Sequence, residues 1–393
     1  MMIRFVHTSD WQIGMKRHFL GAEAQARFDE ARLEAIRKIG KIAADEGCEF
    51  VVVAGDVFDS NFLERRTVYR ALEAIAEAKV PFYLLPGNHD AFDYSSIYRS
   101  PHFVERQPSN LVVLAEPGIH PVEPHAHNTS GNIEILAAPL RTRRPLSDPL
   151  ADAVERARQQ GQLRDKKGLR IAVAHGQVDA IAPGGANPAL ISLEAAQRNI
   201  GERLIDYIAL GDRHSTLSVG ETGRIWYSGS PEPTDYDEQD PGNILIVELD
   251  DSGCRVDKRK IGTWEFIRRE VELSGGQDLE ALDLWLGQLS QKDRKVLKLA
   301  LKGTLTISEE ARLDEILDKA RDLFAALEDW ERKSDLAILP GDDLSDFGLS
   351  GFAKETLERL LAEAGGSEAT AETGALVARD ALRLLWRLAG GQP

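Results

Sequence analysis

The stretch that decides the fold is Phe50-Val51-Val52-Val53-Ala54-Gly55-Asp56-Val57-Phe58-Asp59. Five consecutive apolar residues, three of them valines, predict a short strand that is buried on both faces. Gly55 then lets the backbone turn sharply, and two carboxylates follow directly behind the strand. The segment therefore predicts a layered α/β fold whose polar loops gather where strands end.

Similar apolar runs lie on both sides of this segment. Further strands are predicted at Ile3–His7, Pro81–Leu85, Leu111–Leu114, Ile133–Ala137, Arg170–Ala174, Tyr207–Leu210, Arg224–Tyr227 and Asn243–Glu248. Helices are predicted at Ala22–Ala44 and Glu64–Ala78. The later strands come without long intervening helices, so part of the sheet system should be antiparallel. The expected fold class is α/β, with two stacked mixed β-sheets flanked by helices.

The chain changes character after about Gly262. The segments 265–273, 279–289, 295–301, 309–327 and 336–339 read strand, helix, strand, helix, strand, which predicts a small α+β domain. A turn at Pro340–Asp343 then predicts a linker, followed by helices at 351–364 and 372–389. We therefore divide the chain at 1–262, 263–340 and 341–393. The broad apolar surface of the last helix either docks on the protein's own body or receives a partner.

Composition limits the kinds of function. With 393 residues and a net charge of −16, the chain does not resemble proteins that coat DNA through a uniformly basic surface. Two cysteines predict no disulfide framework, and we see neither a signal peptide nor a run long enough to cross a bilayer. A soluble, cytoplasmic protein is expected.

Potential metal ligands and acid–base groups follow five of the predicted strands. The clusters are Ser9-Asp10-Trp11-Gln12, Gly55-Asp56-Val57-Phe58-Asp59, Gly87-Asn88-His89-Asp90, His175-Gly176 and Gly211-Asp212-Arg213-His214. One aspartate behind a strand is more often a turn or cap residue. Five clusters in this order instead predict a site with two divalent cations, which can activate water and neutralise a phosphate while a histidine supplies the proton.

These motifs resemble the calcineurin-like metallophosphoesterases, and within them the SbcD-type DNA-repair exonucleases. The likeness lies in the order Asp10, Asp56, Asn88-His89, His175 and His214, and in the segments His7–Trp11 and Tyr227–Pro231. It covers roughly the first 250 residues closely and the remainder only in architecture. The resemblance implies a four-layer metallophosphoesterase domain at 1–262.

The resemblance also implies roles for individual residues. Asp10, Asp56 and His214 would bind one metal ion, and Asp56 would bridge to a second ion held by Asn88 and His175. His89 would be the catalytic acid. Two readings remain for the neighbouring carboxylates Asp90 and Asp59: Asp90 orients the imidazole of His89, or both carboxylates cap backbone groups.

Two positions depart from the family pattern. Gln12 stands where a metal-binding histidine is expected, and Asp212 replaces the first histidine of a Gly-His-x-His motif. Both can still offer an oxygen, so we keep both as predicted ligands. Replacing two imidazoles by oxygen donors favours Mn²⁺, or alternatively Mg²⁺, over Zn²⁺.

The implied function is cleavage of DNA as an exonuclease or endonuclease subunit in DNA repair. By resemblance, residues 263–340 would be a capping, DNA-binding domain, and residues 341–393 would bind an SbcC-like coiled-coil ATPase. The chain itself has no Gly-rich phosphate loop with Lys and Ser or Thr. The basic turn with Arg141, Arg143 and Arg144 is the candidate for contacting the DNA backbone, and a solvated loop is its alternative.

Other interpretations stay open at this stage. The chain could be a phosphodiesterase or phosphatase for small molecules, although such a substrate does not need the long second half. It could also be a non-catalytic scaffold whose metal site Gln12 and Asp212 have spoiled. The sequence does not decide whether the protein forms a homodimer.

Overall fold

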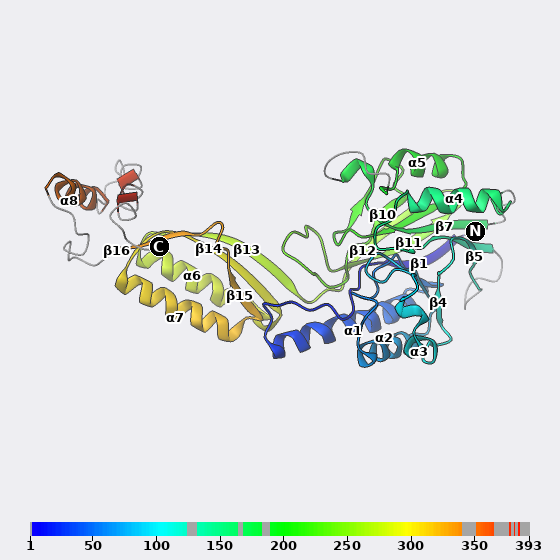
Figure 1. Cartoon of the computed structure of the whole chain (residues 1–393), viewed down its shortest axis with the longest axis horizontal. Coiled ribbons are helices and arrows are strands. Elements are labelled where there is room, and N and C mark those ends of the chain that lie inside the picture. The colour runs from blue at the N-terminus through cyan, green and yellow to red at the C-terminus, as the bar shows by residue number, and fades with distance from the viewer. Residues whose placement is uncertain are drawn as a thin grey trace. The chain divides into compact units, whose positions relative to one another are not determined.

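The computed structural model of the chain describes residues 2–123, 132–163, 168–182, 189–339 and 351–364, together with Val377, Ala378, Ala381, Leu384 and Leu385. It divides into two compact units (Figure 1). Unit 1 comprises Met1–Arg17 and Gln25–Trp264, and unit 2 comprises His18–Ala24 and Glu265–Pro393. The expected linker at Pro340–Asp343 and most of the expected helix at 372–389 lie outside the described residues.

The first sheet of unit 1 has the strand order β12–β11–β1–β2–β3–β4. Its strands are β1 (Met2–Thr8), β2 (Val51–Val53), β3 (Phe82–Leu84), β4 (Leu111–Val113), β11 (Asn243–Asp250) and β12 (Cys254–Lys260). β1 to β4 are parallel, whereas β11 is antiparallel to both β1 and β12. The expected antiparallel pairing is therefore present.

The second sheet of unit 1 has the order β5–β6–β7–β8–β10–β9. Its strands are β5 (Gly118–Pro121), β6 (Asn132–Ala138), β7 (Gly168–His175), β8 (Tyr207–Gly211), β9 (Leu217–Ser218) and β10 (Ile225–Tyr227). β6, β7, β8 and β10 are parallel, and the edge strands β5 and β9 are antiparallel to their neighbours.

The later strands come without long intervening helices, as expected, but two short helices that were not predicted from the sequence separate some of them. Helix α4 (Pro149–Gln159) connects β6 to β7, and α5 (Leu193–Gly201) connects β7 to β8. The local signals are N-caps: Asp148 accepts hydrogen bonds from the backbone N–H groups of Leu150 and Ala151, and Ser192 accepts one from Ala195. Both helices are short but amphipathic, and α4 buries Leu150, Ala153, Val154 and Ala157 on one face.

Four layers result from burial of both faces of each sheet. Val52 of β2 faces a core between the two sheets, where it meets residues such as Phe5 and Ile171. Its neighbours Val51 and Val53 face the opposite way, against helices α1 (Ala22–Asp45), α2 (Arg65–Ala76) and α3 (Pro101–Val104). Helices α4 and α5 cover the outer face of the second sheet (Figure 1). The expected α/β class with two stacked mixed sheets is confirmed.

Unit 2 is a parallel sheet with two helices on one face (Figure 1). β14 (Lys295–Thr306) pairs in parallel with β13 (Glu265–Leu273), β15 (Ala326–Asp329) and β16 (Asp335–Leu339). Helices α6 (Gly276–Gln288) and α7 (Ile307–Leu323) bury leucines against it. The expected helix at 309–327 ends early, because Phe324 adopts an extended conformation and Ala326–Asp329 pairs with β14.

The remaining described elements are short or peripheral. They are the 3-10 turns η1 (Ile97–Arg99), η2 (Asp179–Ile181) and η3 (Lys292–Arg294), and helix α8 (Phe352–Ala364). Within the described ranges, no helix has the length and apolar character needed to span a membrane.

Candidate metal centre

The five clusters of polar residues lie at the carboxyl ends of five parallel strands in two sheets: β1, β2, β3, β7 and β8. Backbone hydrogen bonds join these ends. The N–H of Asp10 donates to Gly55 C=O at 3.0 Å, and that of Gly176 donates to Gly211 C=O at 3.1 Å. Because parallel strands end at one edge, residues far apart in the sequence meet there.

Glycines let the two sheets approach each other at this edge. A Cβ atom on Gly55 would lie 2.1 Å from Nδ1 of His175, and a Cβ atom on Gly211 would lie 1.9 Å from the carbonyl oxygen of Ala54. Any larger residue at either position would therefore push the edges of the sheets apart.

The backbone is strained at the same place. Six non-glycine residues in the described chain have a positive φ, and four of them are in these clusters: Asp10 (53°), Gln12 (50°), Asp56 (53°) and Asp212 (94°). Such a conformation costs roughly 1–2 kcal/mol for a residue with a side chain. Strain of this kind persists where the surrounding structure holds it, and it concentrates at functional sites.

Asp10, Asp56 and His175 form the centre of the site. All three are buried, and they offer one ligand atom each within 4.8 Å of one another. Asp56 Oδ1 accepts a hydrogen bond from the backbone N–H of His89 at 2.9 Å and lies 3.4 Å from Nε2 of His175. Asp10 accepts from Ser9 Oγ at 2.6 Å and from the backbone N–H of Asp212 at 3.1 Å.

Each histidine in the centre is oriented by a partner on its Nδ1 atom. His175 Nδ1 lies 2.8 Å from Ala54 C=O, which turns Nε2 toward Asn88 Oδ1 at 2.7 Å. His214 Nδ1 lies 2.9 Å from Glu238 Oε1, which turns Nε2 toward Asp10 Oδ1 at 3.9 Å. A carbonyl or carboxylate on Nδ1 leaves Nε2 free to bind a metal ion.

The electrostatics of the centre favour bound positive charge. Burial raises the pKa of Asp10 to about 6, whereas for Asp56 the charges of His175 and His89 outweigh burial and lower the pKa to about 2. Burial opposes protonation of His214, but Glu238 and Asp10 outweigh it and raise its pKa to about 9. The pKa of His175 is likewise raised, because Asp56 outweighs burial.

The donor set also fits a divalent cation at Gln12. Its Nε2 donates to Asp56 Oδ2 at 2.9 Å, while its buried Oε1 has no hydrogen-bond partner among the described residues. Half a turn of the amide would bring Oε1 beside the carboxylate, an arrangement that needs a cation between the two oxygens. Asp212 adds another carboxylate, with Oδ1 3.7 Å from His175 Nε2.

His89 faces the cavity from the loop after β3. Its imidazole is 43% exposed, and Nδ1 lies 3.0 Å from the carbonyl oxygen of Asp59. Asp90 does not orient this ring. It is buried and accepts hydrogen bonds from Gly87 N–H (2.7 Å), Phe58 N–H (3.0 Å) and Tyr98 Oη (2.6 Å), so it caps the loop, while Asp59 positions the imidazole.

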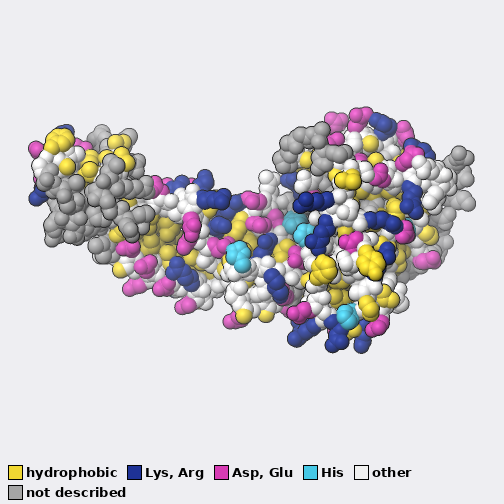
Figure 2. Space-filling model, viewed as in Figure 1, with side chains coloured by type: hydrophobic (Ala, Val, Ile, Leu, Met, Phe, Trp, Pro, Cys, Tyr) yellow, Lys and Arg dark blue, Asp and Glu magenta, His cyan; other side chains and the backbone are white. Residues whose placement is uncertain are grey.

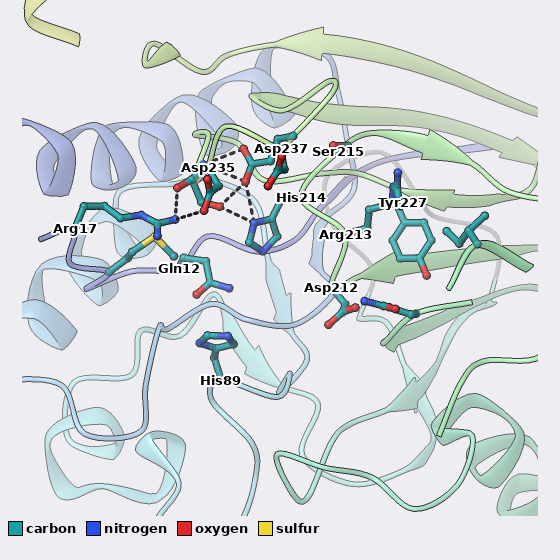
Figure 3. Close-up of a pocket in the computed structure, with 15 residues that line it drawn as sticks. Gln12, Arg17, His89, Asp212, Arg213, His214, Ser215, Tyr227, Asp235 and Asp237 are labelled. Carbon is teal, nitrogen blue, oxygen red and sulfur yellow. Dashed lines mark hydrogen bonds and ion pairs between the residues drawn. The ribbon is translucent and has the colours of Figure 1, made fainter. Parts of the chain in front are cut away.

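A cavity of about 400 Å³ opens onto these groups. Figure 3 shows that Gln12, His89, Asp212 and His214 surround one space, and all four line the cavity. Figure 2 shows Lys and Arg side chains beside exposed histidines on one face of unit 1. Arg141, Arg143 and Arg144 do not line the cavity. Their turn nevertheless runs beside the His89 loop, because Leu140 forms backbone hydrogen bonds with Pro86 and Phe92.

Several residues of the site were not anticipated from the sequence. Glu238 and Thr234 hold Nδ1 of His214, and Arg17 and Arg213 line the cavity. The acidic run Asp235–Glu238 was a usable signal, since a metal-binding histidine normally donates to a carboxylate. Arg17 belongs to a basic pair with Lys16 that could meet a phosphate, but nothing in the sequence assigned either arginine to this site.

Comparison with known proteins gives consistent matches. The family model described as calcineurin-like phosphoesterase matches residues 3–215. The DNA double-strand break repair protein Mre11 of Haloferax volcanii is 24% identical over 382 residues, covering 92% of this chain and 78% of that protein. The SbcD subunit of nuclease SbcCD is 24% identical in Bacillus subtilis (70% of this chain, 71% of that protein) and 25% identical in Rhodobacter capsulatus (60% and 64%).

Proposed function

The chain belongs to the calcineurin-like phosphoesterase family, and from this premise we propose that it is a metal-dependent DNA nuclease that works with a separate ATPase subunit. The observation that carries the proposal is the meeting of Asp10, Asp56 and His175 donors within 4.8 Å, in front of a cavity that His89 also lines. A buried cluster of carboxylate and imidazole donors beside a partly exposed imidazole suits hydrolysis of a phosphodiester.

The residues would divide between two metal ions. Asp10, Gln12 and His214 would hold one ion, Asn88, His175 and Asp212 the other, and Asp56 would bridge them. Bound divalent cations would supply Lewis acidity, because they neutralise phosphate charge and lower the pKa of water. Oxygen donors at Gln12 and Asp212 favour Mn²⁺ first and Mg²⁺ second.

His89 would act as the general acid. The Asp59 carbonyl accepts the proton of Nδ1, so the second proton of the imidazolium lies on Nε2. Transfer of that proton to the departing oxygen leaves a neutral ring in the tautomer that Asp59 already stabilises. Asp90 contributes indirectly, because it anchors the backbone that carries Asn88 and His89.

DNA is the substrate that we favour over a small phosphoester. Two observations support this choice. The relatives are named as DNA-repair proteins or nucleases, and one of them aligns with 92% of this chain. The chain also has a second unit beyond the phosphoesterase. We propose that residues 263–340 cap the site and bind DNA, that residues 341–393 bind an SbcC-like ATPase, and that Arg141, Arg143 and Arg144 contact the DNA backbone. A homodimer would be compatible with this arrangement.

The test is Mn²⁺-dependent cleavage of labelled single- and double-stranded DNA and of a chromogenic phosphodiester. His89→Ala should lower kcat by about 10²–10⁴-fold without loss of bound metal, since a general acid contributes that much. His102→Ala, which removes an exposed histidine of α3, is the matched control and should cleave like the native protein.

Other outcomes distinguish the alternatives. Activity on the chromogenic diester without activity on DNA would favour a small-molecule phosphodiesterase. Inactivity of the native chain, together with activity of a Gln12→His, Asp212→His double variant, would contradict catalysis and favour a scaffold.

A further inference from the structure

The cavity extends past the metal donors in two directions, and an arginine lines each extension. Arg17 and Asp235 lie on one side of Gln12, while Arg213 and Tyr227 lie beyond Asp212 on the other side (Figure 3). Neither arginine is needed to hold a metal ion. Their environments differ in a way that points to a ligand for only one of them.

Arg17 already has hydrogen-bond and ion-pair partners within the protein. Its Nη2 donates to the carbonyl oxygen of Thr234 and lies 3.8 Å from the carboxylate of Asp235. Thr234 in turn contacts His214, because its Oγ1 lies 2.6 Å from Nδ1 of that histidine. Arg17 therefore stabilises the loop that orients His214.

Arg213 has no such partner. Among the described residues its guanidinium forms neither an ion pair nor a hydrogen bond. The buried Nε atom lacks an acceptor in both arginines, but only Arg17 is paired through Nη2. The adjacent carboxylate of Asp212 approaches His175 Nε2 instead, at 3.7 Å. The hydroxyl of Tyr227 donates to Gly176 C=O and accepts from the N–H of Val178, so it too is occupied.

A guanidinium that lines a cavity without forming an ion pair to any of its carboxylates is suited to an anion from outside the protein. Its planar donors match the geometry of phosphate oxygens. Arg213 lines the same cavity as Asp212 and His214, so a phosphate bound to it would lie next to the one held at the predicted metal ligands (Figure 3).

We propose that Arg213 binds the phosphodiester group next to the scissile one, and thereby makes the site selective for a polynucleotide strand over a single phosphodiester. The proposal rests on the proposed nuclease function. It assigns to Arg213 the positioning of the strand and leaves the chemistry to the metal donors and His89.

The first experiment measures the charge that the strand neutralises. In a His89→Ala background with Mn²⁺ bound, which prevents cleavage, binding of a labelled single-stranded oligonucleotide is followed by fluorescence anisotropy at several salt concentrations. Adding Arg213→Gln should weaken binding and reduce the slope of log Kd against log salt by about 0.7, the value for one phosphate contact on a single strand. Arg213→Lys should retain most of that slope.

The matched control for this experiment is Arg158→Gln. Arg158 is an exposed residue of α4 that pairs with Glu155, so the substitution removes one positive charge far from the cavity's lining residues. It should leave the slope unaltered. An equal effect of Arg158→Gln and Arg213→Gln would overturn the proposal, because net charge alone would then explain the result.

The second experiment identifies the phosphate. An oligonucleotide that carries one uncharged methylphosphonate beside the cleaved linkage should be cut about 10- to 100-fold more slowly by the native protein, as expected for loss of one charged hydrogen-bonded contact. In Arg213→Gln the same modification should have less than about a twofold effect, because the contact is already absent.

The outcomes separate this inference from the proposed function. If the native protein cleaves DNA but methylphosphonate slows the native protein and Arg213→Gln equally, the role of Arg213 is refuted and the nuclease stands. If the native protein cleaves the chromogenic diester and ignores DNA, both proposals fall.

Discussion

Replacement of Gly211 by alanine is the sharpest test of how the two sheets build the metal centre. Gly211 ends β8, and its backbone φ suits any residue, so only space excludes a side chain. The added Cβ would lie 1.9 Å from the Ala54 carbonyl oxygen, 2.8 Å from His175 Nδ1 and 2.9 Å from Ser9 Cβ. All three neighbours belong to loops or strand ends of the site.

The expected magnitude follows from these distances. Real Cβ contacts essentially never fall below 3.0 Å, so the ends of β8 and β2 must separate by about 1 Å. Overpacking of this kind costs typically about 1–3 kcal/mol of stability. Because His175 and Asp56 sit at the displaced edge, a shift of that size should also lower kcat by roughly 10²-fold.

The assay combines urea denaturation, calorimetric titration with Mn²⁺ and cleavage of the chromogenic diester. The matched control is Gly201→Ala at the end of α5, where an added Cβ meets nothing within 4 Å. That variant should stay within about 1 kcal/mol of the native protein. Equal stability and equal Mn²⁺ affinity of the two variants would refute the close approach of the sheets.

Three further predictions concern ligand orientation, metal choice and acid stability. Glu238→Gln should weaken Mn²⁺ binding about 10- to 100-fold, since Nδ1 of His214 loses its carboxylate; unaltered affinity in a calorimetric titration would contradict this. A Gln12→His, Asp212→His double variant should shift the preference of the site toward Zn²⁺, which metal analysis after dialysis against mixed ions would detect; unaltered selectivity would mean that these two donors do not set it. Burial lowers the pKa of His7 to about 3, below its unfolded value of 6.5. The neutral form of His7 therefore contributes to stability above pH 6.5, and this contribution is lost as the pH falls from 6.5 toward 3. The free energy of unfolding should drop by about 1.4 kcal/mol per pH unit from this group, and in His7→Asn that part of the slope should be absent.

The sequence by itself determined the five strands that carry the candidate site and the five polar clusters that follow them. Five apolar runs form strands as predicted, because an apolar, β-branched pattern favours a strand whatever the rest of the chain does. These strands are β1, β2, β3, β7 and β8, and they precede Asp10, Asp56, Asn88, His175 and Asp212. The rule that polar loops gather where parallel strands end was then enough to bring these clusters to one edge.

Several short elements were not predicted from the sequence, because their formation depends on contacts with neighbouring strands. Helices α4 and α5 are short enough that their stability depends on packing against the sheet, and β15 pairs with the edge of β14. The N-cap Asp148 and the apolar spacing Leu150, Ala153, Val154 and Ala157 were local signals for α4 that were not used in the prediction from sequence.

Only the tertiary structure decided how each donor is oriented. The partners of the imidazoles are Ala54 for His175, Glu238 for His214 and Asp59 for His89, and they come from other loops. The same is true of Asp90, which a local reading can equally pair with the neighbouring imidazole or with the backbone. The hydrogen bond between Ala54 and His175 joins the two sheets, so it exists only after they meet at an edge free of side chains at Gly55 and Gly211, and the other bonds exist only after separate loops have been brought together.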